Sequence, residues 1–279
     1  MNGAATRLDA ALAAARAAGL DRLDAELLAA HVLDTSRSAV IARPERPLDA
    51  SEAARLETLV TRRARGEPFA LLVGQQAFHA LELEVRPGVL IPRADTETLV
   101  DAVLERMPPA PLRGLDLGCG TGAVALALAA ARPAWHLVAV DAAPAACDLA
   151  RRNAAALGLA SRVEVLEGDW YAPVAGERWD LIVSNPPYVA DDDPDLEAGV
   201  RAHEPAGALF AGADGLDALR VILRAPPLRP DGLVAVEHGH RQAAAVRELM
   251  ASADLRDVTT LTDLARRDRV TLGRAPTRG

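Results

Sequence analysis

An apolar run that ends in two consecutive prolines is the feature that most restricts how this chain can fold. Residues 181–183 (Leu-Ile-Val) read as a buried strand, and Asn185-Pro186-Pro187-Tyr188 follow almost at once. Proline fixes φ and has no backbone N–H, so a strand cannot continue through these prolines. The backbone carbonyls of Asn185 and Pro186 are then left outside a ladder of hydrogen bonds. The pattern predicts a rigid corner at the carboxyl end of a strand.

This corner could hold a group that carries two N–H donors. Asn185 supplies an amide side chain, and the carbonyls beside it supply further acceptors. Two acceptors close together suit an NH2 group, so we expect chemistry on an amide or exocyclic amine nitrogen. The segment is also a good turn initiator, and on its own it does not decide between a site and a simple turn.

A glycine-rich segment upstream predicts a cofactor site. Asp116-Leu117-Gly118-Cys119-Gly120-Thr121-Gly122 follows a short expected strand and opens a helix rich in Ala and Leu. Its glycines permit a tight strand-to-helix turn and close approach of the backbone to a ligand, and the helix begins with free N–H groups. Asp141 ends the next expected strand, where its carboxylate can accept both hydroxyls of a ribose.

Two kinds of cofactor fit this segment. Gly118, Gly120 and Ala123 match the G-x-G-x-x-G/A spacing of sites for nicotinamide dinucleotides, so the glycines alone separate the cofactors weakly. Three other strand-end features favour S-adenosylmethionine: a carboxylate that can face a cationic amino-acid moiety (Asp116), an acid and an aromatic ring that could read an adenine (Asp169 and Trp170), and the proline corner. Polar and aromatic groups at successive strand ends fit ligand binding at the carboxyl edge of an open α/β sheet.

The order of elements predicts three parts. Residues 1–66 are rich in alanine and have leucines at helical spacing, which predicts a small helical domain for substrate recognition. Residues 67–92 contain alternating runs at 69–73 and 81–85, and predict a β-hairpin connector. From 93 to 279 strands alternate with helices, so we expect an α/β fold with a Rossmann-like parallel sheet. Strands are expected at 115–117, 137–140, 163–166, 181–183, 233–237, 258–261 and 270–272, the last two as an antiparallel pair at the sheet edge.

Composition excludes several classes of protein. All 31 basic residues are Arg, so no lysine can serve in a phosphate loop, as a Schiff base or as a general base. The net charge of −8 argues against a mainly electrostatic grip on nucleic acid, without excluding a local Arg patch. No apolar run approaches the ~20 residues of a membrane span, and we do not expect Met1-Asn2-Gly3 to begin a signal peptide. Cys119 and Cys147 give no disulfide framework, so we expect a reduced, cytoplasmic protein.

Two further groups of residues have simple interpretations. His238 and His240 form a His-x-His pair, but no third ligand with suitable spacing lies near them, so we expect no metal site. Asp95 and Thr96 fit a helix cap.

With these motifs assembled, the chain resembles, over nearly its whole length, the protein-(glutamine-N(5)) methyltransferases that modify peptide chain release factors. The Asn-Pro-Pro-Tyr motif is shared with amino-methyltransferases that act on DNA adenine and ribosomal RNA guanine. The N-terminal bundle and the segment Ile91-Pro92-Arg93-Ala94-Asp95-Thr96-Glu97 narrow the match to the glutamine branch. The resemblance also covers 63–68 (Arg-Ala-Arg-Gly-Glu-Pro), 116–122, 169–170, 183–188, 204–205 (Glu-Pro), 237–239 (Glu-His-Gly) and 268–270 (Asp-Arg-Val).

The resemblance implies that a methyl group passes from S-adenosylmethionine to the side-chain amide nitrogen of the glutamine in the Gly-Gly-Gln loop of release factors. A release factor is then the protein partner. For the protein itself we expect a monomer that binds neither nucleic acid directly nor membrane. The alternative is an amino-methyltransferase acting on DNA adenine or ribosomal RNA guanine. By position, the resemblance implies cofactor contacts from Gly118, Cys119, Gly120, Thr121, Gly122, Asp141, Trp170 and Asn185, a grip on the target glutamine by Asn185, Pro186, Pro187 and Tyr188, and a cleft lined by Asp95 and Thr96.

Asn185, Pro186 and Tyr188 are the candidate catalytic residues. An amide nitrogen is a poor nucleophile and a sulfonium methyl is a strong electrophile, so we expect the main task of the protein to be alignment. The Asn185 side-chain oxygen and the Pro186 carbonyl would accept the two N–H bonds and aim the nitrogen lone pair at the methyl carbon. Tyr188 is expected to pack against the flat amide and exclude water.

Overall fold

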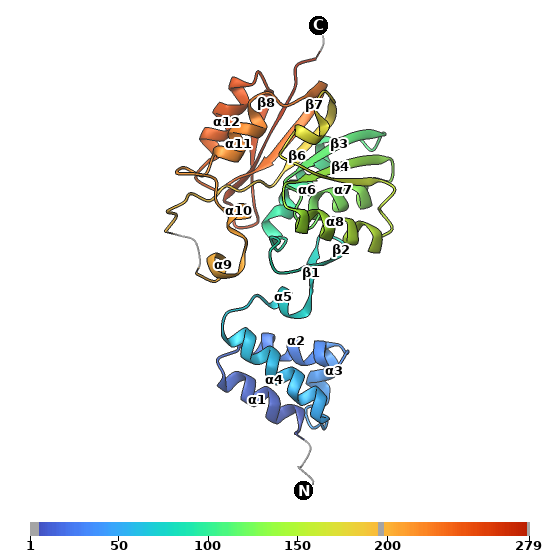
Figure 1. The fold of residues 1–279 in the computed structure, drawn as a ribbon, viewed down its shortest axis with the longest axis vertical. Coiled ribbons are helices and arrows are strands. Elements are labelled where there is room, and N and C mark those ends of the chain that lie inside the picture. Colours follow the sequence, from blue (N-terminus) through green and yellow to red (C-terminus); the bar gives the residue numbers. More distant parts are fainter. Residues whose placement is uncertain (1–5, 195–197, 278–279) are drawn as a thin grey trace. The chain divides into compact units, whose positions relative to one another are not determined.

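The computed structural model describes residues 6–194 and 198–277, and the chain divides into two compact units, Met1–Gly74 and Gln75–Gly279. Figure 1 shows that the first unit is helical and that the second is built on a central sheet. Met1-Asn2-Gly3, where the sequence has no signal-peptide pattern, lie outside the described residues.

The helical unit has one apolar core, in which Leu28 and Leu56 are buried. Its helices are α1 (Leu8–Ala17), α2 (Arg22–Val32), α3 (Arg37–Ala42), α4 (Ala50–Ala64) and α5 (Phe69–Val73). Asp21, Ser36 and Asp49 each accept a backbone N–H at the start of α2, α3 and α4, which satisfies donors that a helix leaves unpaired. The helices expected over residues 1–66 are therefore present, with caps that the sequence encodes locally.

The alternating run at 69–73 is not a strand. These residues form α5, a short helix that ends at Gly74 with φ of 77°. The strand prediction is wrong here because Ala70 and Leu72, which alternate with Phe69, Leu71 and Val73, are also apolar and are buried. An apolar run without a polar face fits one turn of helix as well as a strand.

The hairpin of the expected connector lies wholly in the second unit. β1 (Gln75–Phe78) pairs antiparallel with β2 (Leu81–Glu84). Phe78 and Leu83 are buried in the core that surrounds one face of the large sheet, so the hairpin packs on that unit. The contacts within the chain therefore place the division between the units after Gly74, inside the expected connector 67–92.

The central sheet contains seven strands in the order β5-β4-β3-β6-β7-β9-β8. They are β3 (Leu112–Leu117), β4 (Trp135–Asp141), β5 (Val163–Glu167), β6 (Trp179–Ser184), β7 (Leu228–Glu237), β8 (Arg256–Thr262) and β9 (Asp268–Arg274). Neighbours from β5 to β7 pair parallel, while β9 is antiparallel to both β7 and β8. The predicted parallel sheet and its antiparallel edge pair are confirmed.

Helices cover both faces of this sheet (Figure 1). One face packs against α6 (Glu97–Arg106), α7 (Ala123–Ala131) and α8 (Pro144–Ala156), and the other against α11 (Asp217–Leu223) and α12 (Ala243–Ser252). The central strands are apolar nearly throughout because both of their faces are covered. The shorter helices are η1 (Ala94–Thr96), η2 (Ala172–Val174), α9 (Ala198–His203) and α10 (Ala206–Leu209). Among the described residues, no helix is long and apolar enough to cross a bilayer.

The order of the strands fixes where a ligand can bind. From β3 the chain proceeds to β4 and β5 in one direction across the sheet, and then returns to place β6 and β7 on the other side of β3. The connections that follow β3 and β6 therefore diverge, and this leaves a crevice at the carboxyl ends of these two strands.

Candidate active site

A cavity of about 390 Å³ opens at the carboxyl ends of β3, β4, β5 and β6. It brings together these predicted site residues: Asp116, Gly118, Cys119, Gly120, Thr121, Asp141, Asp169, Trp170, Asn185 and Pro187. Thr96 also lines the cavity, as the resemblance implied, whereas Asp95, Gly122, Pro186 and Tyr188 do not belong to its lining. Thr96 precedes α6, but its side chain makes no cap hydrogen bond there.

The glycine loop between β3 and α7 forms the floor of this cavity. The backbone N–H groups of Gly118 and Cys119 both donate to the carbonyl of Val140, at 2.8 and 3.0 Å, which turns the chain away from the sheet. Gly118 and Gly122 have φ of 71° and 82°, a region that residues with a Cβ avoid. Gly122 thus serves the turn into α7.

Asn153 on α8 supports the same loop, a role that was not predicted from the sequence. Its Nδ2 donates to the carbonyls of Thr121, at 3.0 Å, and of Glu84, at 3.1 Å, and its Oδ1 accepts the Glu84 N–H at 2.8 Å. The buried amide therefore joins the glycine loop to the β1–β2 hairpin. A lone Asn in an alanine-rich helix gives no signal of this role.

Asp141 lies at the end of β4, beside the glycine loop. Its Oδ2 accepts the Gly120 N–H at 2.8 Å and its Oδ1 accepts the Ala143 N–H at 2.9 Å. Each carboxylate oxygen can accept a second hydrogen bond, so the two oxygens remain able to receive a pair of hydroxyl groups from a ligand.

Asp116, at the end of β3, is almost fully buried. Its Oδ2 accepts the Ala125 N–H at 3.1 Å. Burial raises the pKa of this carboxyl to about 7, and the neighbouring Asp141 contributes in the same direction. A positively charged group in the cavity would favour the ionised form of Asp116, because it offsets the loss of solvation. Cys119 is buried too, and burial raises the pKa of its thiol well above the usual value.

Asp169 and Trp170 follow β5 and face the same cavity. Trp170 has φ of 43°, an unusual value for a residue with a Cβ. The ring lies against the glycine loop, since a Cβ added to Gly118 would be 3.7 Å from Trp170 Cζ3. Gly168 allows this turn because a Cβ there would collide with the ring of Pro173. The strained backbone thus holds an aromatic face over the loop.

Asn185 follows β6, and its side chain is anchored from one end only. The Ser184 hydroxyl donates to the carbonyl of Leu117 at 2.6 Å and fixes the end of β6 to the end of β3. Asn185 Nδ2 donates to Thr96 Oγ1 at 2.9 Å. Within residues 6–194 and 198–277, no protein donor reaches Asn185 Oδ1 or the carbonyl of Pro186. The two acceptors that the sequence predicted are therefore free.

Tyr188, the last residue of the corner, is held by the protein at both ends. Its hydroxyl donates to Glu237 Oε1 at 3.1 Å, and its carbonyl accepts from Gln242 Nε2 at 2.9 Å. Burial, together with the nearby carboxylate of Glu237, raises the pKa of the phenol. The ring packs against the core on the α11–α12 face.

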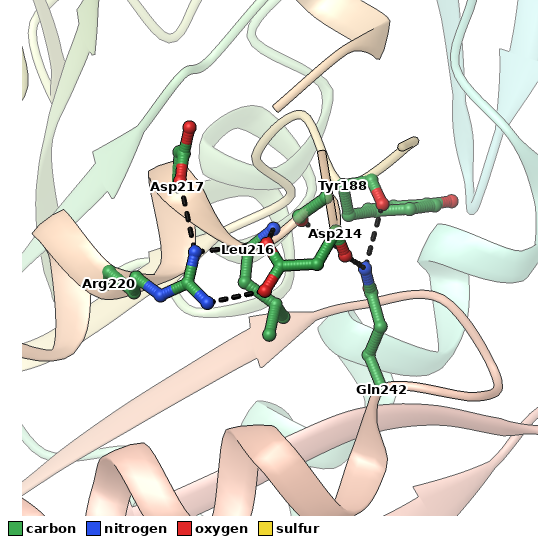
Figure 2. Close-up of polar contacts among 7 residues, drawn as sticks. Tyr188, Asp214, Leu216, Asp217, Arg220 and Gln242 are labelled. Atoms are coloured by element: carbon green, nitrogen blue, oxygen red, sulfur yellow. Dashed lines mark hydrogen bonds and ion pairs between the residues drawn. The ribbon is translucent and has the colours of Figure 1, made fainter. Parts of the chain in front are cut away.

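Gln242 joins three segments around this corner (Figure 2). Besides the Tyr188 carbonyl, its Nε2 faces the carbonyls of Asp214, at 3.1 Å, and Gly215, at 3.3 Å. Its Oε1 accepts the Gly239 N–H at 2.8 Å. The Asp214 side chain in turn pairs with Arg220 on α11 (Figure 2). Gln242 was not predicted as a site residue, because nothing in the local sequence distinguishes it from a polar surface residue.

A buried carboxylate also joins two parts of the cavity wall. Glu204 Oε1 pairs with Arg93 at 2.8 Å, and Glu204 Oε2 accepts the Ile91 N–H at 3.2 Å. Arg93 lines the cavity, and so does Pro205, the residue that follows Glu204. The segments that carry Ile91 and Pro205 are thus connected, although more than a hundred residues separate them.

His238 has a partner for each ring nitrogen. Nδ1 lies 2.9 Å from the carbonyl of Gly239 and Nε2 lies 2.8 Å from Thr271 Oγ1. Burial lowers the pKa of the imidazole, so the neutral ring is favoured. Among the described residues, no group of three or more His, Cys, Asp or Glu side chains is arranged to hold a metal ion.

Two family models match the chain, one within each of its two compact units. Residues 5–74 match the PrmC N-terminal domain, and residues 93–212 match the Methyltransferase small domain. A 16S rRNA methyltransferase from T. Thermophilus, solved with AdoMet and guanosine, has a similar fold with a TM-score of 0.51 and 21% sequence identity, over 72% of this chain and 49% of that one.

Curated relatives extend over nearly the whole length. The "Release factor glutamine methyltransferase" of Xylella fastidiosa (strain Temecula1) is 48% identical over 95% of this chain and 98% of its own. The protein of the same name from Escherichia coli (strain K12) is 44% identical over 91% of this chain and 92% of its own. The similarity includes both the helical unit and the sheet unit, and the chain therefore belongs to the release factor glutamine methyltransferase family.

Proposed function

We propose that this protein transfers a methyl group from S-adenosylmethionine to the side-chain amide nitrogen of the glutamine in the Gly-Gly-Gln loop of peptide chain release factors. The observation that carries the proposal is the arrangement of the Asn-Pro-Pro-Tyr corner. Asn185 Nδ2 is bound to Thr96, while Asn185 Oδ1 and the Pro186 carbonyl accept nothing from the described protein. Two free acceptors beside a cofactor cavity match the two N–H donors of a carboxamide.

The lining of the cavity favours S-adenosylmethionine over a dinucleotide. Asp116, Asp141 and Asp169 contribute three carboxyl groups, which suit the sulfonium and ammonium groups of S-adenosylmethionine and would repel a pyrophosphate. Arg93 is the basic residue of the described lining, and it is already paired with Glu204. Asp141 offers acceptors to the ribose hydroxyls, and Trp170 offers an aromatic face to the adenine.

The residues of the corner would act by alignment. S-adenosylmethionine, when bound, supplies a methyl group on a sulfonium, which is a strong electrophile. Asn185 Oδ1 and the Pro186 carbonyl accept the two N–H bonds of the glutamine, fix the plane of its carboxamide and aim its nitrogen at the cavity. As positive charge develops on that nitrogen, the same preformed acceptors stabilise it. A proton then leaves the alkylated nitrogen for water, so the corner needs no strong base.

The release factor is proposed as the partner of a monomer in the cytoplasm. The helical unit is nearly neutral, and we assign it to recognition of the protein substrate, because a single glutamine offers too little surface for a specific complex. Two free, buried cysteines are compatible with a reducing compartment. The curated relatives favour this substrate over DNA adenine or ribosomal RNA guanine.

Mass spectrometry of a purified release factor tests the proposal. After incubation with the enzyme and S-adenosylmethionine, we expect a mass gain of one methylene group on the glutamine of the Gly-Gly-Gln peptide. A release factor in which this glutamine is replaced by Glu serves as the control and should remain unmodified. Transfer of labelled methyl to DNA or ribosomal RNA, with none to the release factor, would refute the assignment.

A further inference from the structure

A short segment before α6 carries the side chain that anchors Asn185. Thr96 ends the 3-10 turn η1, and its Oγ1 accepts from Asn185 Nδ2 at 2.9 Å. Thr96 is almost fully buried, so this contact lies inside the protein rather than in solvent. A turn of three residues has too few hydrogen bonds of its own to be rigid. The position of the Asn185 side chain therefore depends on how the rest of the protein holds residues 91–97.

Both ends of this segment are bound to distant parts of the chain. Near its start, Glu204 pairs with Arg93 at 2.8 Å and accepts the Ile91 N–H at 3.2 Å. At its end, Glu97 Oε1 accepts the His79 N–H at 2.9 Å. A further contact holds the middle of the segment, where the turn η1 lies.

Asp95, the residue before Thr96, pairs with Arg269 near the start of β9. Asp95 Oδ2 lies 3.2 Å from Arg269 Nη2, and the Asp95 side chain is half exposed. The Arg269 side chain is only 10% exposed, and its Nε and Nη2 both donate to Asp263 Oδ2, at 3.3 and 3.2 Å. The guanidinium is thus the fixed member of its pair with Asp95.

Asp263 is itself fixed by the backbone of the β8–β9 hairpin. Its Oδ1 accepts the Arg267 N–H at 3.0 Å, and its own N–H donates to the Arg267 carbonyl at 2.9 Å. A buried carboxylate needs a partner of opposite charge, and Arg269 supplies it. One carboxylate neutralises one guanidinium, so charge balance does not require Asp95. The ion pair between Asp95 and Arg269 therefore calls for another explanation.

We propose that Arg269 is a positioning residue for methyl transfer, which holds the turn η1 through Asp95. This inference rests on the proposed function. The turn presents the Thr96 hydroxyl that anchors Asn185, and alignment of reacting groups is sensitive to displacements of about 1 Å. A displaced turn would let the Asn185 carboxamide rotate, so that its free Oδ1 would no longer face the substrate. The segment before α6 and the start of β9, both covered by the resemblance, then act together at the active site.

Steady-state kinetics of D95N with S-adenosylmethionine and a purified release factor test the proposal. This variant removes the charge of a half-exposed side chain and leaves the buried pair of Arg269 and Asp263 intact. We expect kcat to fall about fivefold, the scale of a contact that acts through intervening residues, with both KM values unchanged. D95E retains a carboxylate and should recover most of the loss. D231N is the matched control, because Asp231 is similarly exposed, pairs with Arg256 at 2.8 Å and lies in the first half of β7.

A double variant separates positioning through Thr96 from other effects. T96V removes the hydroxyl that anchors Asn185, so D95N/T96V should lose no more kcat than T96V alone. The melting temperature of D95N should match that of D231N.

Four results would each overturn the inference while leaving the proposed function intact. These are wild-type kcat in D95N or T96V, a change in KM without a change in kcat, losses that multiply in the double variant, and a melting temperature of D95N clearly below that of D231N. If the wild-type enzyme itself leaves the release factor unmethylated, the proposed function fails and this inference fails with it.

Discussion

The side-chain amide of Gln242 donates to the carbonyl of Tyr188 over 2.9 Å, and so holds the last residue of the Asn-Pro-Pro-Tyr corner from outside the cavity. The contact is tight, because a Cβ added to Gly215 would collide with the same carbonyl. The prolines stiffen the corner along the chain, and Gln242 fixes its far end against the loop that carries Asp214 and Gly215 (Figure 2).

Q242L should lower both the stability and the turnover of the enzyme. Leucine has a similar size but leaves the Tyr188 carbonyl and the Gly239 N–H without their partner, so we expect a loss of about 1–3 kcal/mol in the free energy of unfolding, measured with urea. Turnover should fall further than cofactor affinity, since Gln242 does not line the cavity. Q75L, at an exposed position on β1, is the control and should leave the free energy of unfolding nearly unchanged. A stable Q242L enzyme with wild-type kcat contradicts the assigned clamp.

Replacement of Asn185 by Ala should lower the rate of methyl transfer by several orders of magnitude. The variant removes an acceptor that acts on the reacting nitrogen itself, and alignment is the main contribution expected of this protein. Cofactor affinity, measured by calorimetry, should fall far less, because the ribose and adenine contacts are assigned to Asp141 and Trp170. Retained turnover in this variant would remove Asn185 from the mechanism.

The parts of the site that the sequence predicts are those made by contiguous residues. The glycine loop and the proline corner each combine a strand end with residues whose backbone restrictions are local, so their positions at the carboxyl edge follow from the alternation of strands and helices. The parallel sheet places the carboxyl ends of its strands at one edge, and Asp116, Asp141 and Asn185 therefore line one cavity.

The supporting contacts could not be predicted in this way. Thr96 is 89 residues from Asn185 and Gln242 is 54 residues from Tyr188, and each pairing depends on how loops from separate strands meet. Glu237 belongs to the segment 237–239 that the resemblance covers, but its hydrogen bond with Tyr188 depends on the order of strands in the sheet. The strand predicted at 69–73 is wrong for a different reason. Five consecutive apolar residues have no periodicity that separates a strand from a helix.

G122A should destabilise the protein more than G158A. Both glycines have positive φ, 82° and 68°, and a side chain there costs about 1–2 kcal/mol for the backbone alone. A Cβ at Gly158 meets nothing within 4 Å, whereas one at Gly122 would lie 3.1 Å from Leu126 Cδ1 and 3.2 Å from the Cβ of Ala150. Overpacking adds about 1–3 kcal/mol in such a site. Urea unfolding of the two variants measures the difference. Equal free energies of unfolding would show that α7 and α8 can move apart to accept the added Cβ without loss of stability.

Cofactor affinity should rise with pH up to about 7 and then level off. Burial raises the pKa of Asp116 to about 7, so at lower pH the carboxyl is neutral before the cofactor binds. A cationic group placed beside it favours the ionised form, and binding must then release the proton. Affinity below the pKa therefore falls by up to about tenfold for each unit of pH, whereas above the pKa no proton is released and affinity is constant.

Calorimetry of S-adenosylmethionine binding across this range measures the effect, and the proton released can be counted from buffers that differ in ionisation enthalpy. Glu237 titrates in the same range, so the variant D116N is required to identify the group. The amide that replaces the carboxyl in D116N has no charge at any pH, so the cofactor affinity of this variant should be weaker than wild type at alkaline pH and independent of pH. The sign is decisive: an affinity that decreases as the pH rises through about 7 would mean that the buried carboxyl binds the ligand in its neutral form, and Asp116 would then face no cation.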